Sequence, residues 1–175
     1  MKLSNFMGLA ATVLMVSLQA NAVDETKQLD ITAEVFDCLG NMTKVGDYFV
    51  TNILGELEET KAVAESEVGG IFPPGSLVSL IPDEVMVKHK EGWNPQTNDW
   101  EFFLLNIEGS DVSIADRGTD DVINKFDGNC LTCHQLARPE WDFICGTDHG
   151  CAPLPVTREQ ISAIQNSDSR CEMKD

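Results

Sequence analysis

The chain has 175 residues, with 29 acidic and 12 basic side chains, a formal net charge of −17 and six cysteines. At 42% hydrophobic and 23% charged residues it has the composition of a globular protein, and its length suits one domain with its own core. The negative charge argues against nucleic acid, whose recognition needs clustered lysine and arginine, and against an anionic membrane surface. Basic or neutral partners are favoured instead.

The first 22 residues have the organisation of a secretory signal peptide. Lys2 supplies a positive start, an apolar stretch runs from Phe6 to Leu18, and Ala20-Asn21-Ala22 fits the A-x-A cleavage pattern. A retained membrane anchor is disfavoured because the apolar run is shorter than the ~20 residues of a spanning helix. We therefore expect cleavage after Ala22, one mature domain at residues 23–175, and export to the periplasm, where unoccupied thiols are oxidised.

Helical patterns are predicted near the two ends of the mature chain, with strands between them. Apolar residues recur at helical spacing from Ile31 to Met42, and Thr157 forms a capping box with Gln160 before a last short helix. The segment Leu57–Ser66 fits either a helix or a strand. Strands are expected within Val45–Leu54 and at Ser76–Ile81, Glu84–Lys88, Trp100–Ile107 and Val112–Asp116, the fourth of them apolar on both faces and therefore central. The predicted fold class is α+β, a small antiparallel sheet with flanking helices.

Cys130, Cys133 and His134 form a C-x-x-C-H motif, the attachment site for c-type haem. Two thiols three residues apart on one turn can each form a thioether bond with a haem vinyl group. The adjacent His134 is then held beneath the macrocycle, where its imidazole can bind the iron. The motif predicts one covalent haem c near a C-terminal helical segment, and the expected export meets the requirement that attachment takes place outside the cytoplasmic membrane.

Three other kinds of site use the same cysteine spacing. A disulfide oxidoreductase has C-x-x-C, but the βαβ pattern of thioredoxin-like proteins is absent. A structural zinc site needs four ligands, and no second C-x-x-C lies at finger spacing. A plain structural disulfide is the third alternative.

The other four cysteines suggest two disulfides, for which three connectivities are open. The short loop between Cys145 and Cys151 favours a local pair. That pairing leaves Cys38 to tie the start of the mature chain to its C-terminal tail through Cys171.

Several short segments occur in a characteristic order between Phe72 and Val156. They are Phe72-Pro73-Pro74-Gly75-Ser76, Met86-Val87-Lys88, Gly92-Trp93-Asn94-Pro95, Asn98 to Phe103, the C-x-x-C-H motif, and Pro139 to Phe143. This order, over about half of the chain, resembles the cytochrome P-460 and cytochrome c′-beta family. The resemblance implies a haem-bearing antiparallel sheet, commonly a homodimer, with five-coordinate iron that binds diatomic gases or oxidises hydroxylamine and nitric oxide.

One position departs from the enzymatic members of that family, which cross-link a lysine to the haem edge. Counted from Gly75, the corresponding residue is Leu80, which has no amine; Lys88 and Lys90 match only in a different strand register. This difference favours a cytochrome that carries electrons or binds nitric oxide or carbon monoxide. The alternative, an enzyme that oxidises hydroxylamine or a related nitrogen compound, requires a polar group such as Glu84 or Glu101 beside the iron.

A second iron ligand is sought among Met42, Met86, His89, His149 and Met173. None stands out, and the resemblance implies an open position capped by apolar rings such as Phe49 or Phe72. The expected partners are a small diatomic ligand or a redox protein with a basic surface, which the acidic chain would steer. Nucleic acid is not an expected partner, and neither is a membrane after signal cleavage.

Overall fold

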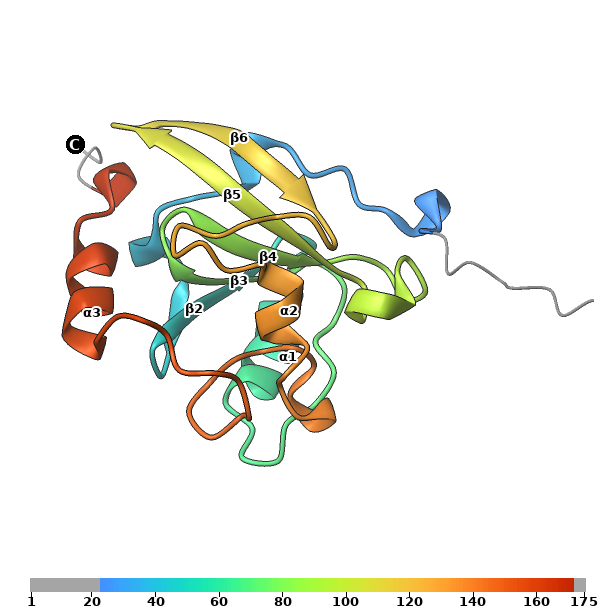
Figure 1. Cartoon of the computed structure of the whole chain (residues 1–175). Helices are drawn as coiled ribbons and strands as arrows, with labels where there is room; N and C mark the ends of the chain where they lie inside the picture. The colour runs from blue at the N-terminus through green and yellow to red at the C-terminus, as the bar shows by residue number, and fades with distance from the viewer. Residues whose placement is uncertain (1–22, 172–175) are drawn as a thin grey trace, which may run out of the picture.

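The computed structural model describes residues 23–171, so the predicted signal peptide and Met173 lie outside the described residues. Six strands form one antiparallel sheet in which each strand pairs with the next along the chain (Figure 1). They are β1 (Thr43–Val45), β2 (Tyr48–Asn52), β3 (Ser76–Ile81), β4 (Glu84–Lys88), β5 (Trp100–Glu108) and β6 (Asp111–Gly118). Short turns suffice for this order because antiparallel neighbours need no crossover.

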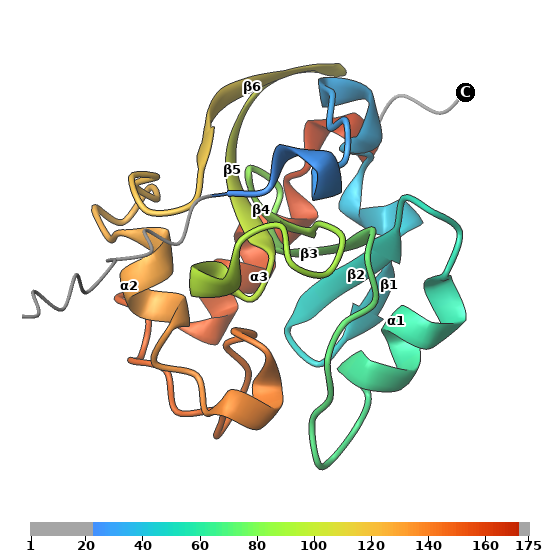
Figure 2. The same cartoon turned by 90° about the vertical axis from the view of Figure 1, so that its right-hand side faces the viewer.

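Three α-helices accompany the sheet: α1 (Leu57–Ala64), α2 (Cys130–His134) and α3 (Arg158–Asn166). Helices α1 and α2 lie on one side of the sheet, and the N-terminal segment lies on the other (Figures 1 and 2). The α3 helix packs beside β3. These elements confirm an α+β architecture with a small antiparallel sheet, and no helix within residues 23–171 is long and apolar enough to cross a membrane.

Successive side chains of each strand point to opposite sides, and this alternation divides the core into two apolar clusters. We call the side that packs against α1 and α2 the α2 face. Its buried residues are Tyr48, Val50, Phe72, Val78, Met86, Trp100, Phe102, Val122 and Ile144. We call the other side the N-terminal face, and its buried residues are Leu29, Ile31, Phe36, Leu77, Val85, Val87, Phe103 and Leu105.

Most of the strand predictions are confirmed, two of them with the predicted bounds, Ser76–Ile81 and Glu84–Lys88. The ambiguous segment Leu57–Ser66 contains the helix α1. The capping box is also confirmed, because the Thr157 hydroxyl accepts a hydrogen bond from the Gln160 N–H while the Gln160 side chain accepts one from the Thr157 N–H. The strand β5 is second from the sheet edge, and only its first half is buried on both sides.

The predicted helix from Ile31 to Met42 is wrong. This segment forms two 3₁₀ turns, Ala33–Val35 and Leu39–Asn41. Backbone groups in and next to it bond to distant side chains instead: the Leu29 N–H to His89 (2.8 Å), the Leu39 N–H to Asp168 (2.9 Å) and the Ile31 carbonyl to Arg117 (3.0 Å). These hydrogen bonds join the segment to distant parts of the fold. Outside its 3₁₀ turns the chain forms no helix, and its apolar side chains pack against the sheet from an irregular backbone.

Candidate functional site

The C-x-x-C-H motif forms the short helix α2, which lies against the α2 face of the sheet (Figure 1). Asn129 begins the helix, and its side chain accepts a hydrogen bond from the Thr132 N–H at 2.9 Å. Cys130 and Leu131 pack against the apolar cluster of this face. One helical turn therefore carries Cys130, Cys133 and His134 along the edge of the core.

Both cysteines of the motif are free thiols, and each is half-buried. The other four form the disulfides Cys38–Cys171 and Cys145–Cys151, which confirms the favoured connectivity. Burial raises the pKa of Cys130 to about 12, and the nearby carboxylate of Glu84 adds to the shift. A thiol with so high a pKa carries no thiolate at neutral pH, whereas an attacking cysteine of an oxidoreductase needs a lowered pKa.

The imidazole of His134 is fixed in one tautomer by its neighbours. Its Nδ1 lies 2.7 Å from the backbone carbonyl oxygen of Phe143. A carbonyl can only accept, so Nδ1 carries the proton and Nε2 keeps its lone pair. Burial lowers the pKa of His134, and the hydrogen bond to Phe143 opposes part of that shift. The residue thus presents a neutral imidazole with one nitrogen ready to bind a metal, the arrangement that metal-ligating histidines share.

The carbonyl that orients His134 belongs to an unusual stretch of backbone. Asp142 and Phe143 have φ angles of 47° and 66°, in the left-handed region. Each residue other than glycine that adopts this conformation costs about 1–2 kcal/mol. The side chain and backbone of Asp142 are bonded on several sides, and these contacts hold the segment in place.

Lys88 of β4 and Asp142 form a buried ion pair beside that segment, with 2.7 Å between Lys88 Nζ and Asp142 Oδ2. Lys88 also donates to the Asn98 carbonyl and lies over the Trp100 ring, 5.0 Å from its centre. Burial lowers the pKa of Lys88 and raises that of Asp142, and the attraction between the two charges opposes both shifts. Local sequence patterns could not identify this pair, because Lys88 and Asp142 lie 54 residues apart.

Leu80 packs, half-buried, against the α2-face cluster that also contacts Cys130 and Leu131. The position counted as that of the cross-linking lysine therefore lies on the α2 face of the sheet, and it is apolar. Glu84 is half-buried, and its carboxylate accepts the Lys125 N–H at 2.8 Å. Burial raises the pKa of Glu84, and the hydrogen bond from the Lys125 N–H opposes part of that shift.

The suggested second ligands are spread over both faces. Met86 and the capping ring Phe72 are buried in the α2-face cluster, whereas Met42 packs on the N-terminal face. Phe49 alternates with the buried Tyr48 and Val50, so it too points toward the N-terminal face. The His149 ring stacks on Trp141 with 3.8 Å between ring centres.

His89 and Glu101 belong to a buried network on the N-terminal face. His89 Nε2 lies 2.7 Å from a Glu101 carboxylate oxygen, and Arg117 donates to the same carboxylate through two nitrogens at 2.7 and 2.8 Å. Because His89 Nδ1 accepts the Leu29 N–H, both ring nitrogens are occupied. Glu101 is buried, with 4% exposure, and lies on the face opposite to the C-x-x-C-H motif. A charged residue inside an apolar strand was the signal for this network.

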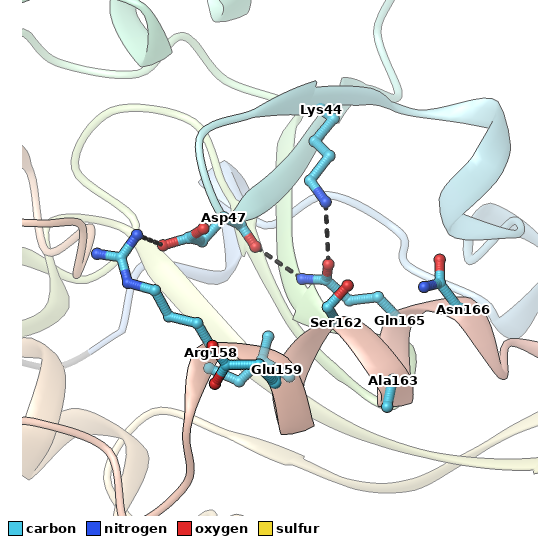
Figure 3. A pocket seen from close by; sticks show the side chains of 9 residues that line it. Lys44, Asp47, Arg158, Glu159, Ser162, Ala163, Gln165 and Asn166 are labelled. Atoms are coloured by element: carbon cyan, nitrogen blue, oxygen red, sulfur yellow. Dashed lines mark hydrogen bonds and ion pairs between the residues drawn. The ribbon is translucent and has the colours of Figure 1, made fainter.

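A surface hollow of about 520 Å³ lies beside α3 (Figure 3). Its lining residues are Lys44, Asp47, Arg158, Glu159, Ile161, Ser162, Ala163, Gln165 and Asn166. Lys44 donates to Gln165 and Arg158 pairs with Asp47, so the cations of the hollow are engaged within the protein. None of these residues belongs to the C-x-x-C-H segment.

A zinc site is not supported by the arrangement of metal-binding side chains. Within residues 23–171, the group of such side chains whose ligand atoms all lie within 4.8 Å of one another is Cys38, Asp168 and Cys171. Its two cysteines are joined in a disulfide. The thiols of α2 and His134 do not converge on one point in this way. A c-type haem requires no convergence, because the thiols bind the porphyrin edge and the histidine binds its centre.

A comparison with protein-family models, curated proteins and solved structures finds no match for this chain. The family resemblance therefore stays a prediction, and the donor groups of α2 and their surroundings are the features from which a function can be inferred.

Proposed function

We propose that this protein is an exported mono-haem c-type cytochrome that carries electrons or binds a small diatomic gas. Cys130 and Cys133 hold the haem through thioether bonds, and His134 Nε2 binds its iron. When bound, the haem supplies one-electron redox chemistry and a site for nitric oxide or carbon monoxide. The resemblance to the cytochrome P-460 and cytochrome c′-beta family and the homodimer it implies belong to the same proposal.

The observation that carries the proposal is the hydrogen bond from His134 Nδ1 to the Phe143 carbonyl. It selects the tautomer that a metal-ligating histidine needs and aims the ring. Two free thiols on the same helical turn complete the donor set, while the remaining described cysteines are joined in pairs. Those disulfides are compatible with an oxidising compartment such as the periplasm.

The chain's own residues have separable tasks in this function. Cys130 and Cys133 fix the cofactor, and the neutral imidazole of His134 donates its lone pair. Phe102, whose ring centre lies 5.4 Å from that of His134, packs beside the imidazole. Apolar residues of the α2 face pack beside α2, and apolar surroundings of this kind would favour small neutral ligands over anions.

Intact mass spectrometry tests the covalent attachment. The full chain, expressed with its leader in a bacterium that matures c-type cytochromes, should yield the mature polypeptide plus one haem, with pigment that resists acid-acetone extraction. The Cys133→Ser variant should lose the stable pigment. A matched control, the Cys145→Ser/Cys151→Ser double variant, removes a cysteine pair outside the motif and should retain the haem. Colourless wild-type protein with the mass of bare polypeptide would overturn the proposal.

Glu84 keeps the enzyme alternative open, because it is a half-buried carboxyl group on the same side as Cys130 and could move protons there. Glu101 cannot serve, since it lies on the other face. Optical spectra with hydroxylamine separate the two functions. We expect the protein to bind carbon monoxide without oxidising hydroxylamine; turnover that the Glu84→Gln variant loses would favour the enzyme.

A further inference from the structure

We propose that Lys88 and Asp142 are positioning residues for His134, because their buried pair keeps the Phe143 carbonyl aimed at its Nδ1. The inference rests on the proposed haem function and adds to it a device that sets the electron donation of the iron ligand. The Lys88–Asp142 pair, buried in an apolar core, thereby has a role that the sequence around neither residue indicated.

Three separate parts of the fold converge on Asp142. Its carboxylate accepts the Phe72 N–H at 2.9 Å, from the loop before β3, and both carboxylate oxygens accept from Lys88 of β4 at 2.9 and 2.7 Å. Its backbone carbonyl accepts the Trp100 Nε1–H of β5 at 2.8 Å. The residue before Phe143 is thus fixed at its side chain and at its carbonyl by the rigid sheet.

This fixation matters because the local backbone would not hold its shape unaided. Asp142 and Phe143 are consecutive left-handed residues with side chains, a conformation that persists only where the surroundings enforce it. A return of either residue to the right-handed region rotates the peptide units and turns the Phe143 carbonyl away from His134. The direction of that carbonyl therefore depends on the contacts that hold Asp142, among which the pair with Lys88 is the charged one.

The carbonyl in turn sets how strongly His134 donates to a metal. A hydrogen bond from Nδ1 to an oxygen raises the basicity of the imidazole and fixes the ring orientation. A more basic axial ligand favours ferric over ferrous iron, so it lowers the reduction potential. Loosening Asp142 should weaken this hydrogen bond, shift the potential to more positive values, and weaken the iron–histidine bond.

The test compares haem-loaded wild type with the Asp142→Asn variant, using the reduction potential and the iron–histidine stretching band of the ferrous protein. Asparagine keeps the shape of aspartate but leaves the Lys88 ammonium without its anion. We expect a more positive potential and a band at lower wavenumber. The control is Asp168→Asn, which breaks an equally buried pair with Arg170, whose Nη2 lies 2.8 Å from Asp168 Oδ2. That variant should lose stability and leave both signatures unchanged.

Equal signatures in wild type and Asp142→Asn would overturn the inference, as would equal shifts in both variants. If Asp142→Asn fails to fold, Trp100→Phe removes the hydrogen bond to the Asp142 carbonyl and should give a smaller shift in the same direction; an unchanged band there would also overturn it. The proposed function fails separately, since in that case wild-type protein carries no haem to measure.

Discussion

Lys88, the last residue of β4, and His89, which follows it, point to opposite faces of the sheet, and each is buried and bonded to a distant segment. Lys88 pairs with Asp142 on the α2 face, next to the carbonyl that orients His134. His89 accepts the Leu29 N–H on the N-terminal face and contacts Glu101. Because successive side chains of an extended chain point to opposite sides, two buried polar groups lie on opposite faces of the sheet at the same place. We call the Lys88–Asp142 pair the α2-face anchor, and the network of His89, Glu101 and Arg117 the N-terminal anchor.

The two anchors differ in what they hold. The α2-face anchor stabilises a left-handed stretch of backbone beside the candidate iron ligand. The N-terminal anchor holds the segment around Leu29 and Ile31, because His89 accepts the Leu29 N–H and Arg117 donates to the Ile31 carbonyl. The α2-face anchor therefore keeps the backbone beside His134 in position, whereas the N-terminal anchor holds the N-terminal segment over the core. This contrast predicts that perturbing the N-terminal face changes stability alone, whereas perturbing the α2 face changes both stability and the site.

The largest effect is expected from the disulfide with the longer sequence separation. Cys38 and Cys171 are separated by 133 residues, so removing their bond with serines should cost about 5 kcal/mol of unfolding free energy. Cys145 and Cys151 are only 6 residues apart, and removing their bond should cost about 2 kcal/mol. Denaturant unfolding of the two double variants measures the difference.

The smaller of these two losses should be accompanied by a change at the site, because Cys145 Sγ lies 3.9 Å from the Cys133 carbonyl oxygen. The optical spectrum of the Cys145→Ser/Cys151→Ser protein checks this. A spectrum that changes in the Cys38→Ser/Cys171→Ser protein and not in this one would contradict the division of tasks between the faces.

The second effect compares the ion pairs of the two anchors. The Lys88 and Asp142 side chains are 5% and 0% exposed, whereas Arg117 is 34% exposed. Lys88→Met leaves the buried Asp142 carboxylate without its cation and should lower the free energy of unfolding by about 3 kcal/mol. Arg117→Met should lower it by about 1–2 kcal/mol, because water reaches the Arg117 side chain. Chemical denaturation of both variants provides the measurement.

The Lys61→Met variant is a suitable control for that comparison. Lys61 pairs with Glu58, whose side chain is 80% exposed, so this surface pair should contribute less than about 0.5 kcal/mol. If Arg117→Met lowers the free energy of unfolding more than Lys88→Met does, the N-terminal anchor contributes more to stability than the α2-face anchor.

The sequence predicted the sheet better than the segments that cover it. Alternating and apolar runs identified Ser76–Ile81 and Glu84–Lys88 with their bounds because strand periodicity is a local property. The same reasoning failed from Ile31 to Met42, where helical spacing exists but the backbone groups bond to His89, Asp168 and Arg117. Such partners lie far away in sequence, so local patterns carry no information about them.

The candidate site divides in the same way. Cys130, Cys133 and His134 were identified because their chemistry depends on spacing within one turn. Asp142 and Lys88 were not, since their pairing across 54 residues and the left-handed backbone it holds arise only in the folded chain. Glu101 gave a usable clue, a charge within an apolar strand, that indicated a buried partner on one of the two faces.

The last effect concerns how the stability that the N-terminal anchor provides changes with pH. Burial of Glu101 would raise its pKa, but the hydrogen bonds from His89 and Arg117 outweigh this and hold the pKa below its ordinary value of 4.5. A depressed pKa means that the carboxylate stabilises the fold above about pH 4.5, and that this contribution is lost as the pH falls through the lowered value. Glu101→Gln should therefore cost about 2 kcal/mol at pH 7 and lose less stability than wild type between pH 7 and pH 3. Denaturant unfolding along that pH range measures the difference, with the exposed Glu108→Gln as the matched control on the same strand. A Glu101→Gln protein whose stability falls as steeply as that of wild type would show that the N-terminal anchor does not depend on this charge.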